Sequence, residues 1–369
     1  MEEQSLLTSC FLPVNLKKNI VGQSRPFLIA GPCSAESPEQ LSAVAVSLKE
    51  RIHLFRAGIW KPRTRPGSFE GLGEVALPWL IEAGRVSGLP VAVEVANREH
   101  VEKAIDAGVD VLWIGARTTV NPFAVQEIAE VLLGVKNVPV MVKNPVNPDL
   151  NLWIGAFERL EKAGVADLVA VHRGFSVYEH PKYRNVPNWE IPIALKERLP
   201  ELPIICDPSH IAGKRELLQE VAQKAMDLNM DGLMLETHLD PVNALSDPEQ
   251  QLTPAGFIEL VNSLILRSRA VATEIADQLL EMRQKTAILD DKLFDILSAR
   301  MRLSEEIGNF KKDHHVTVLQ PEHWMKIISQ RLAQANDLDL SEDFVRQVMD
   351  AIHQESIRHQ TKIMNRHDD

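Results

Sequence analysis

Short apolar runs alternate with longer amphipathic stretches over roughly the first 250 residues of the chain. Eight of these runs have the length and composition of buried strands. They are Phe27–Ala30, His53–Arg56, Val91–Val95, Val111–Ile114, Val140–Val142, Leu168–Val171, Ile204–Cys206 and Gly232–Leu235. Helix-like stretches separate them, and eight strand-then-helix units are typical of a closed (β/α)8 TIM barrel.

The pattern changes near Pro254. Before that residue Pro and Gly are frequent, whereas from Ala255 to Gln320 there is no proline and the glycines are Gly256 and Gly308. Such a stretch favours long helices. We expect a last barrel helix and then three helices of an all-α domain, at about Ala255–Leu266, Thr273–Asp313, Pro321–Ala335 and Ser341–Met364. The predicted domains are a barrel over residues 1–266, a linker over 267–273 and a helical domain over 274–369.

Residues that could bind a metal ion follow several of the predicted strands. Cys33 follows the first strand, His210 the seventh, and Glu236 and Asp247 the eighth. The active site of a (β/α)8 barrel lies at the C-terminal ends of its strands, so we expect these four at one mouth. A thiolate, an imidazole and two carboxylates suit Mn, Fe, Zn or Co better than Mg or Ca.

Cationic residues fall at or near the same strand ends. They are Arg56, Lys61, Arg63, Arg117, Lys143 and Arg173. Burial of such charges would be costly without an anionic partner. So many cations around one mouth imply a substrate with several negative charges, most simply two phosphorylated compounds. Glycines in the loop from Lys61 to Gly73 let backbone N–H groups approach an anion.

The composition argues against some classes of partner. A net charge of −11 argues against nucleic acid as a ligand. The chain has no apolar stretch long enough to span a membrane, and Met1–Gln4 lacks the basic start of a signal peptide. The three cysteines, Cys10, Cys33 and Cys206, form no disulfide framework. We therefore expect a cytoplasmic protein with neither a nucleic-acid nor a membrane partner.

Six short motifs in the first part of the chain occur together in one known family. They are Gly31-Pro32-Cys33-Ser34, Lys61-Pro62-Arg63-Thr64, Ile114-Gly115-Ala116-Arg117, Val171-His172-Arg173-Gly174, Asp207-Pro208-Ser209-His210 and Ala244-Leu245-Ser246-Asp247. Over about Pro26 to Val261 the chain resembles the type I-beta 3-deoxy-D-arabino-heptulosonate 7-phosphate (DAHP) synthases, which are related to 3-deoxy-D-manno-octulosonate 8-phosphate (KDO8P) synthases. The resemblance implies a metal-dependent condensation of phosphoenolpyruvate with erythrose 4-phosphate.

The resemblance also implies roles for the residues at the mouth. Cys33, His210, Glu236 and Asp247 would bind the metal, for which we expect Mn²⁺, with Fe, Co and Zn as alternatives. Phosphoenolpyruvate would be held by Arg117, Lys143 and Arg173. Erythrose 4-phosphate would meet the catalytic Lys61 together with Arg63 and Thr64, with Arg56 close to the junction of the two substrates. The chain has Arg65 where relatives commonly have Ser, and we interpret it as a solvated loop residue.

The predicted helix Thr273–Asp313 carries three basic residues at informative spacings. Lys311 lies 11 positions after Arg300, about three turns, so the two share a face. Arg283 lies 17 positions before Arg300, which is roughly 25 Å along the helix and about 100° around it. Arg283 therefore cannot reach a pocket at Arg300 and Lys311 of its own helix. The spacing predicts a dimer in which Arg283 completes the site of the partner subunit. Ser356 and Gln360, four positions apart, point together.

From about Leu279 to Gln360 the tail resembles the all-helical class of chorismate mutase. Arg283, Arg300, Lys311, Ser356 and Gln360 occupy the family's functional positions. The resemblance implies a dimer in which Arg residues bind the dicarboxylate, while Lys311 and Gln360 donate to the ether oxygen of chorismate. The chain departs from the family in a few places. Gln320 and Trp324 replace acidic residues that contact substrate, although Gln320 retains hydrogen-bonding capacity, and His323 stands at a nearby Arg position.

Together these features predict a bifunctional shikimate-pathway enzyme that makes DAHP and converts chorismate to prephenate. Two alternatives remain open: a synthase whose helical domain is a non-catalytic dimerisation or sensing module, and a KDO8P-type synthase. The barrel pattern begins within about 27 residues of the first residue, so we expect no separate N-terminal regulatory domain. The mutase domain is then the expected feedback sensor, with chorismate or prephenate as its ligand. We expect at least a homodimer, and a tetramer is an open alternative.

Overall fold

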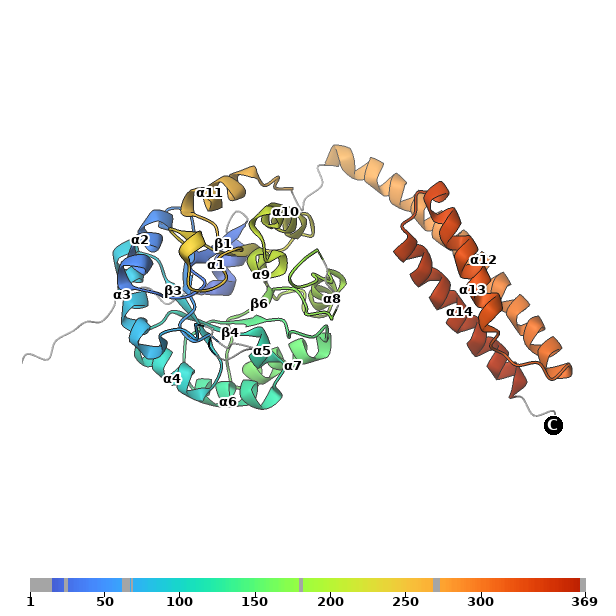
Figure 1. The fold of residues 1–369 in the computed structure, drawn as a ribbon, viewed down its shortest axis with the longest axis horizontal. Coiled ribbons are helices and arrows are strands. Elements are labelled where there is room, and N and C mark those ends of the chain that lie inside the picture. The colour runs from blue at the N-terminus through green and yellow to red at the C-terminus, as the bar shows by residue number, and fades with distance from the viewer. Residues whose placement is uncertain are drawn as a thin grey trace, which may run out of the picture. The chain divides into compact units, whose positions relative to one another are not determined.

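The chain forms two compact units in a computed structural model, residues 1–269 and residues 270–369 (Figure 1). The structure describes residues 15–22, 26–61, 67, 69–178, 182–267 and 273–365. Each unit is described by itself. The predicted linker, 267–273, spans the division between them, and residues 268–272 lie outside the described part of the chain.

The first unit is a closed barrel of eight parallel strands in the order β1 to β8 (Figure 1). The strands are β1 Phe27–Gly31, β2 Leu54–Ala57, β3 Val91–Val95, β4 Val111–Ile114, β5 Val140–Lys143, β6 Leu168–His172, β7 Ile204–Cys206 and β8 Gly232–Glu236. Closure comes from a five-residue register between β1 and β8, from Phe27 opposite Gly232 to Gly31 opposite Glu236. The predicted fold class is confirmed, and each strand lies within a residue of its predicted range at either end.

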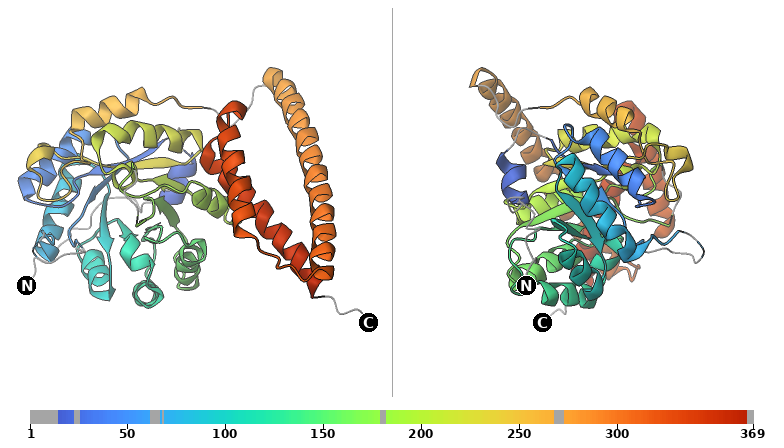
Figure 2. Two further views of the ribbon diagram at one scale, coloured as in Figure 1. Left: turned by 45° about the vertical axis from the view of Figure 1, so that its right-hand side comes forward. Right: turned by 90° about the vertical axis from the view of Figure 1, so that its left-hand side faces the viewer.

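Helices form an outer ring around the strands (Figure 2). They are α2 Pro38–Leu48, α3 Leu77–Ser87, α4 Arg98–Asp106, α5 Ala116–Thr119, α6 Pro122–Leu132, α7 Leu150–Lys162, α8 Glu190–Arg198, α9 Pro208–Ala212, α10 Leu218–Asp227 and α11 Pro254–Ser263. Short 3₁₀ turns lie at Gly73–Ala76, Arg215–Leu217 and Pro241–Asn243. Side chains cap several helix starts; Ser37 accepts from Gln40 N, and Asn97 accepts from His100 N.

Side chains inside the barrel follow the two-residue period of a strand. The buried inner layer includes Leu54, Ala92, Trp113, Met141 and Met234. Two positions after an inner apolar residue, the same strand face carries a charge, as in Arg56 after Leu54, Lys143 after Met141 and Glu236 after Met234. The inner face therefore changes from apolar to charged toward the C-terminal ends of the strands, which places the charges at the mouth.

A short helix, α1 (Leu16–Gly22), completes the inner core. Leu16 and Ile20 are buried in the same cluster as the inner barrel residues. The Asp167 carboxylate, just before β6, accepts hydrogen bonds from the backbone N–H groups of Leu16 and Lys17, at 2.5 and 2.7 Å. Asp167 thus satisfies two donors at the start of α1 and fixes the helix against the beginning of the strand.

The last barrel helix is shorter than predicted, because α11 ends at Ser263 rather than near Leu266. Beyond Ser263, the backbone of Ile265 forms hydrogen bonds with the side chain of Gln223 on α10 instead of with the backbone of a longer helix. Its Nε2 donates to Ile265 O at 3.0 Å, and its Oε1 accepts from Ile265 N at 2.9 Å. This paired amide contact holds Ile265 outside the helix.

The second unit consists of α12 Thr273–Asp313, α13 Pro321–Ala335 and α14 Glu342–Met364, with a 3₁₀ turn at Asn336–Leu338. The predicted ranges of the three helices are confirmed, and Ser341 caps α14 by accepting from Phe344 N. Contacts between α12 and α14 advance in the same direction along both helices, from Arg300–Ser356 to Lys311–Gln360. The two helices therefore run parallel; α13, which packs on α14, carries the chain back from the end of α12 to the start of α14. No helix in the described ranges is long and apolar enough to cross a membrane.

The packing of α1 yields a first prediction. Leu16→Ala should destabilise the barrel by about 2–5 kcal/mol, because Leu16 is fully buried and its removal leaves a cavity in the inner core. Urea unfolding followed by tryptophan fluorescence measures this, since five of the six tryptophans lie in the barrel unit. Val46→Ala, at a position on α2 that is 45% exposed, is the control and should change stability by less than about 0.5 kcal/mol. Equal effects of the two substitutions would contradict the assigned packing.

Candidate active site

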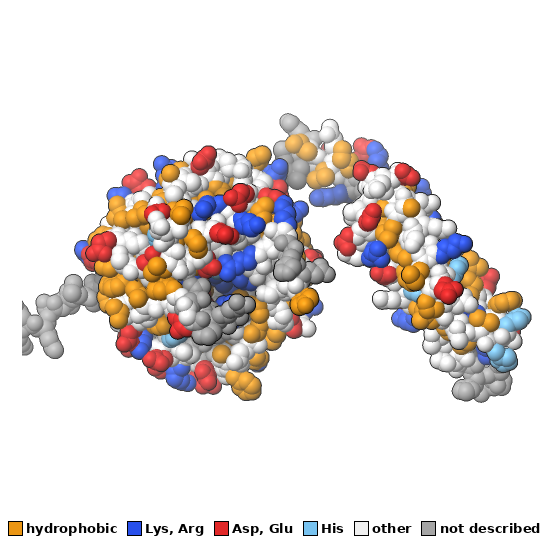
Figure 3. Space-filling view, viewed as in Figure 1, with side chains coloured by type: hydrophobic (Ala, Val, Ile, Leu, Met, Phe, Trp, Pro, Cys, Tyr) orange, Lys and Arg blue, Asp and Glu red, His pale blue; other side chains and the backbone are white. Residues whose placement is uncertain are grey.

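Lys and Arg side chains gather in the centre of one face of the barrel unit, inside the ring of helices (Figure 3). This is the region to which the strand alternation directs Arg56 and Lys143. Both are buried, with 1% and 3% of their surface exposed. The Arg56 guanidinium lies 4.8 Å from the centroid of the Trp113 ring, and Lys143 Nζ lies 5.9 Å from it. Trp113 thus forms an aromatic floor below two cations.

The first pair of predicted metal ligands joins the loops after β1 and β8. The Cys33 thiol donates to Asp247 Oδ2 at 3.2 Å. Two further contacts tie the same loops, Ser34 Oγ to Ser246 Oγ at 2.5 Å and Cys33 N to Gln251 Oε1 at 3.0 Å. Asp247 has a φ of +47° and precedes Pro248. This is an unfavourable backbone conformation for the residue, so its position depends on the contacts of its side chain.

The second pair of predicted ligands joins α9 to β8. Asp207 caps α9 by accepting from His210 N, and its Oδ2 lies 2.8 Å from His210 Nδ1. The other ring nitrogen, Nε2, faces Glu236 Oε1 at 3.8 Å, which is longer than a hydrogen bond. Burial lowers the pKa of His210, which favours the neutral ring. His210 Nδ1 forms no hydrogen bond within the described structure, so its contact with Asp207 only approximates the carboxylate-held histidine of a metal site.

Charges at the mouth shift the pKa values of these groups in different directions. Burial, reinforced by the Glu236 charge, raises the pKa of the Cys33 thiol to about 12. Burial also pushes the pKa of Glu236 upward, but His210, Arg56 and Lys61 outweigh it and hold that pKa below its usual value. Burial also acts to raise the pKa of Asp247, but the charges of Arg184 and Lys61 outweigh it and hold this pKa below its usual value. The carboxylates are therefore ionised, while the thiol keeps its proton without a bound metal.

The four predicted ligands suit a divalent metal in kind, and they lie as two contacting pairs. Among the residues that the structure describes, no three His, Cys, Asp or Glu side chains already converge as a metal centre. Two cations lie against the donors instead. Lys61 Nζ donates to Cys33 Sγ at 2.9 Å, and Arg56 Nη1 donates to Glu236 Oε1 at 3.1 Å. The donor set and the orientation of His210 fit a metal site that requires Lys61 to leave the sulfur.

The remaining predicted cations lie near these pairs. Lys143 Nζ contacts Asp207 Oδ2 at 3.0 Å. The Arg173 side chain donates to neutral groups, Asn185 Oδ1 at 2.7 Å and Gly174 O at 3.4 Å. Burial lowers the pKa of Arg173 to about 10; the Asp207 charge opposes this change, and the Arg184 and Arg117 charges add to it. Arg173 therefore remains a cation whose hydrogen bonds within the described structure go to uncharged partners.

The predicted sugar-binding loop is described only at its base. Arg63, Thr64 and the departure at Arg65 lie outside the described residues. At the base, Lys61 N donates to Glu70 O at 2.9 Å. Trp60 stacks on His100 with centroids 4.1 Å apart. Gly71 has a φ of +86°, and a Cβ there would lie 2.0 Å from Ile59 O, so this turn requires glycine.

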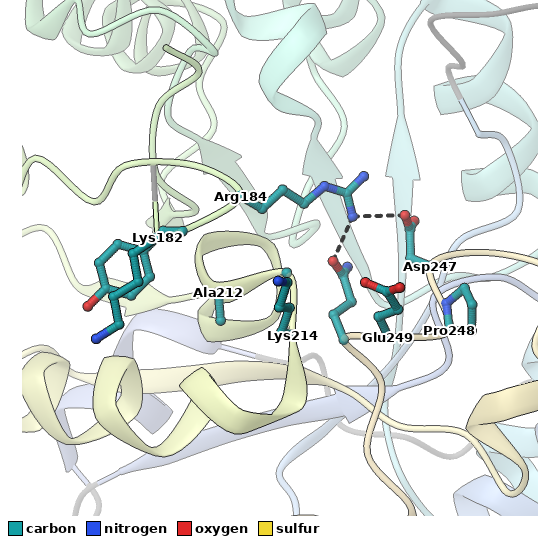
Figure 4. Close-up of a pocket in the computed structure, with 10 residues that line it drawn as sticks. Lys182, Arg184, Ala212, Lys214, Asp247, Pro248 and Glu249 are labelled. Carbon is teal, nitrogen blue, oxygen red and sulfur yellow. Dashed lines mark hydrogen bonds and ion pairs between the residues drawn. The ribbon is translucent and has the colours of Figure 1, made fainter. Parts of the chain in front are cut away.

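Four residues outside the predicted set also belong to this site: Asp207, Arg184, Asn185 and Gln250. Asp207 contacts both Lys143 and His210. Its position directly after β7 is a signal in the sequence that it lies at the mouth of the barrel. Arg184 and Gln250 line a cavity of about 560 Å³ beside Asp247, together with Lys182, Lys214 and Glu249 (Figure 4). Arg184 and Asn185 come from the loop between β6 and α8, where no strand end marks them.

The helical unit brings four of its predicted residues together. Arg300 Nη1 donates to Ser356 Oγ at 2.6 Å, and Lys311 Nζ donates to Gln360 Oε1 at 3.1 Å and Val318 O at 2.7 Å. Gly308 allows the close approach of α14, since a Cβ there would lie 3.1 Å from Gln360 Cα. Burial lowers the pKa values of Arg300 and Lys311. These contacts form a partly buried cationic cluster where α12 packs on α14.

The other two predicted residues of this unit, Arg283 and Gln320, are exposed, and Trp324, a departure from the family, stacks on a histidine. Arg283 is exposed on α12, 17 residues before Arg300. Gln320 is exposed and immediately precedes α13, while Trp324 stacks on His353 with centroids 3.9 Å apart and ring planes 7° apart. Burial lowers the pKa of His353, and so do the charges of Arg300 and Lys311. The charges of the cationic cluster therefore act on the Trp324–His353 pair.

Comparisons with known proteins relate the two parts of the chain to two families. The profile of the DAHP synthetase I family matches residues 11–286, and that of chorismate mutase type II matches residues 282–361. Phospho-2-dehydro-3-deoxyheptonate aldolase from Thermotoga maritima is 32% identical over 256 residues, which cover 69% of this chain and 73% of the relative. A 2-dehydro-3-deoxyphosphooctonate aldolase from Rhodopseudomonas palustris is 27% identical, with 64% of this chain and 86% of the relative covered.

Solved structures give the same result for the barrel. The crystal structure of the Thermotoga maritima phospho-2-dehydro-3-deoxyheptonate aldolase (DAHP synthase) matches with a TM-score of 0.58 and 29% identity, covering 69% of this chain and 70% of that one. A truncated form of the Thermotoga maritima 3-deoxy-D-arabino-heptulosonate 7-phosphate synthase matches with a TM-score of 0.56 and 28% identity, covering 64% of this chain and 84% of that one.

Proposed function

Because the chain belongs to the DAHP synthetase I family and carries a chorismate mutase type II domain, we propose that one polypeptide catalyses two steps of the shikimate pathway. The barrel would condense phosphoenolpyruvate with erythrose 4-phosphate to give DAHP and phosphate. The helical domain would rearrange chorismate to prephenate. Cys33 and Cys206 are free thiols, as expected for the reducing cytoplasm in which we place the protein.

The observation that carries the barrel proposal is the excess of cations around one potential metal site. Arg56, Lys143 and Arg184 each contact a carboxylate, but the hydrogen bonds of Arg173 go to neutral partners. Phosphoenolpyruvate, with a phosphate and a carboxylate, would be bound by Arg117, Lys143 and Arg173. Holding two phosphorylated substrates face to face offsets the repulsion and the loss of entropy that oppose their encounter.

We assign the bond-forming step to the junction between Lys61 and the metal-ligand pairs. A divalent cation, most simply Mn²⁺, held by Cys33, His210, Glu236 and Asp247 would supply a Lewis acid for the aldehyde oxygen of the sugar. C3 of phosphoenolpyruvate attacks the aldehyde carbon, water adds at C2, and phosphate leaves. Lys61 Nζ, which donates to Cys33 Sγ in this structure, would leave the sulfur and donate to the oxyanion that develops at the aldehyde oxygen. Arg63 and Thr64 would hold the phosphate of the sugar.

For the helical domain we propose a dimer with shared sites. Along α12, large apolar side chains recur at every seventh position and are 55–65% exposed in the single chain: Ile275, Met282, Leu289, Ile296, Leu303 and Phe310. A stripe with this period suits a second helix packed along it. A partner α12 could bring Arg283 to the cluster formed by Arg300, Lys311, Ser356 and Gln360. These donors bind the two carboxylates and stabilise charge on the ether oxygen, and Gln320 would contact a hydroxyl group.

We further propose that the helical domain regulates the barrel. Prephenate, or chorismate, bound at Arg300 would favour an arrangement in which the barrel is less active. Such control requires the ligand to bind the two arrangements with different affinities. Two alternatives are kept for testing: a helical domain that binds without catalysis, which the Trp324–His353 stack favours, and an octulosonate-type barrel, which the relatives at 27–28% identity favour.

The barrel reaction is tested by the loss of phosphoenolpyruvate with erythrose 4-phosphate and Mn²⁺. We expect turnover that a chelator abolishes and that His210→Ala lowers by at least about 100-fold, because the variant lacks one proposed ligand. Lys103→Ala, on an exposed ion pair of α4, should retain the rate. Faster turnover with the five-carbon arabinose 5-phosphate would instead support the octulosonate alternative.

The shared mutase site is tested by complementation. Arg283→Ala and Arg300→Ala should each abolish most mutase activity. If each site takes Arg283 from one subunit and Arg300 from the other, an equimolar mixture after subunit exchange should recover about a quarter of the sites, since half of the dimers are mixed and have one intact site. Exchange without recovery would rule out the shared site. Absence of mutase activity in the unsubstituted protein would support the binding-only alternative.

Feedback is tested by titrating prephenate into the condensation assay. Prephenate should inhibit the barrel, and Arg300→Ala should raise the half-inhibiting concentration at least about tenfold, measured against the variant's own uninhibited rate, because it removes a ligand contact. Arg302→Ala, two residues away on an exposed position of α12, is the control and should keep the sensitivity. An Arg300→Ala variant with full sensitivity would contradict sensing at this cationic cluster.

A further inference from the structure

Two consecutive residues, Arg184 and Asn185, are fixed between the two halves of the barrel site. Their backbone N–H groups donate to Ala212 O and Ile211 O of α9, at 3.3 and 3.2 Å. The next residue, Val186, forms a two-way backbone bridge with Phe175, with both hydrogen bonds at 2.8 Å. The loop is therefore attached to α9, which carries His210, and to the segment that follows Arg173.

Arg184 connects the two carboxylates of the proposed metal site. Its Nη1 donates to Asp247 Oδ1 at 2.8 Å and to Gln250 Oε1 at 2.7 Å (Figure 4). The amide oxygen of Gln250 faces the Arg184 guanidinium, so the amide nitrogen of Gln250 faces Glu236. Gln250 Nε2 donates to Glu236 Oε2 at 2.6 Å. One cation thus orients Asp247 directly and Glu236 through Gln250.

The contact with Asp247 compensates an unfavourable backbone. Asp247 has a φ of +47° before a proline, so its conformation needs support from its surroundings. The Arg184 side chain is 47% exposed, and ordering a long exposed side chain costs conformational entropy. Its two hydrogen bonds to buried or half-buried acceptors offset that cost. This arrangement is typical of a residue that orients a ligand-binding carboxylate.

Asn185 connects the phosphate-binding and metal-binding halves of the site. Its Oδ1 accepts from Arg173 Nη1 at 2.7 Å, and its Nδ2 donates to His210 O at 2.6 Å. The side chain is buried, with 5% of the residue exposed. A second amide, Asn144, accepts from Arg173 N at 2.7 Å. Asn185 therefore aims the guanidinium of Arg173 while it holds the backbone of a proposed metal ligand.

We propose that Arg184 and Asn185 are positioning residues that couple metal binding to phosphoenolpyruvate binding. The inference rests on the proposed function of the barrel. The two residues are adjacent in the chain, and their backbone is bonded to α9. A displacement of Arg173 therefore shifts the backbone of Arg184 and Asn185, whose side chains contact Asp247 and the backbone of His210. Binding at either half then orders the other half, and the coupling is reciprocal: each ligand tightens the other by the same factor.

The test measures two dissociation constants without turnover. Mn²⁺ binding is followed by the electron paramagnetic resonance signal of the free ion, with and without phosphoenolpyruvate. Arg184→Ala should weaken Mn²⁺ binding about 10- to 100-fold, whereas its affinity for phosphoenolpyruvate without metal, measured by calorimetry, should change less than about twofold. Asn185→Ala should weaken phosphoenolpyruvate binding about tenfold and reduce the coupling factor at least threefold.

Two further variants separate positioning from a general structural role. Arg184→Lys keeps a cation near Asp247 and should recover part of the Mn²⁺ affinity, which a loss of folding would not allow. Arg85→Ala removes an exposed ion pair with Glu82 on α3 and should bind both ligands as the unsubstituted protein does. Thermal melting curves of all variants report on folding.

The outcomes distinguish this inference from the function on which it rests. If the unsubstituted protein binds no Mn²⁺, or if His210→Ala binds it equally well, both are overturned. If His210→Ala loses Mn²⁺ but Arg184→Ala keeps the full affinity, the inference alone is overturned. An Asn185→Ala variant with an unchanged coupling factor overturns the role of Asn185.

Discussion

Closure of the sheet by β1 and β8 is the constraint on which the site depends. The five-residue register places Gly31 opposite Glu236, so the loop carrying Cys33 meets the loop carrying Asp247 more than 200 positions later. A Cβ at Gly31 would lie 1.9 Å from Arg56 O, and glycine therefore permits β1 to approach β2 closely at this rim. Because parallel strands all end on the same side, closure also places Arg56, Lys143 and Asp207 around one opening.

The charges around this opening are tolerated because they are paired before any ligand binds. Arg56 contacts Glu236, Lys143 contacts Asp207, and Arg184 contacts Asp247. Isolated buried charges would be strongly destabilising, and pairing reduces that cost without necessarily adding stability. The same pairs leave cations available to exchange partners. An anionic substrate or a divalent metal can therefore replace an internal contact rather than enter an uncompensated site.

The sequence was informative where periodicity or an element boundary carried the signal. Strand ends predicted Arg56 and Lys143 at the mouth, and the loss of proline after Pro254 predicted the helices of the second unit. The end of α11 was predicted wrongly because the Gln223 amide, on another helix, decides it. Arg184 and Gln250 were missed for a similar reason, since their importance depends on contacts between loops that no local pattern encodes. The metal ligands and the shared mutase site stay predictions.

The position of α1 sets the order in which the barrel core can be completed. Leu16 and Ile20 precede every strand, yet they are buried among inner residues contributed by all eight strands, and their helix is fixed by Asp167, about 150 positions later. During synthesis these residues leave the ribosome before every strand of the barrel, and the Asp167 carboxylate that holds them follows only just before β6. Contacts of such long sequence separation form slowly. The earliest part of the barrel to be made is thus among the last to be protected, which exposes it to proteases and chaperones throughout translation.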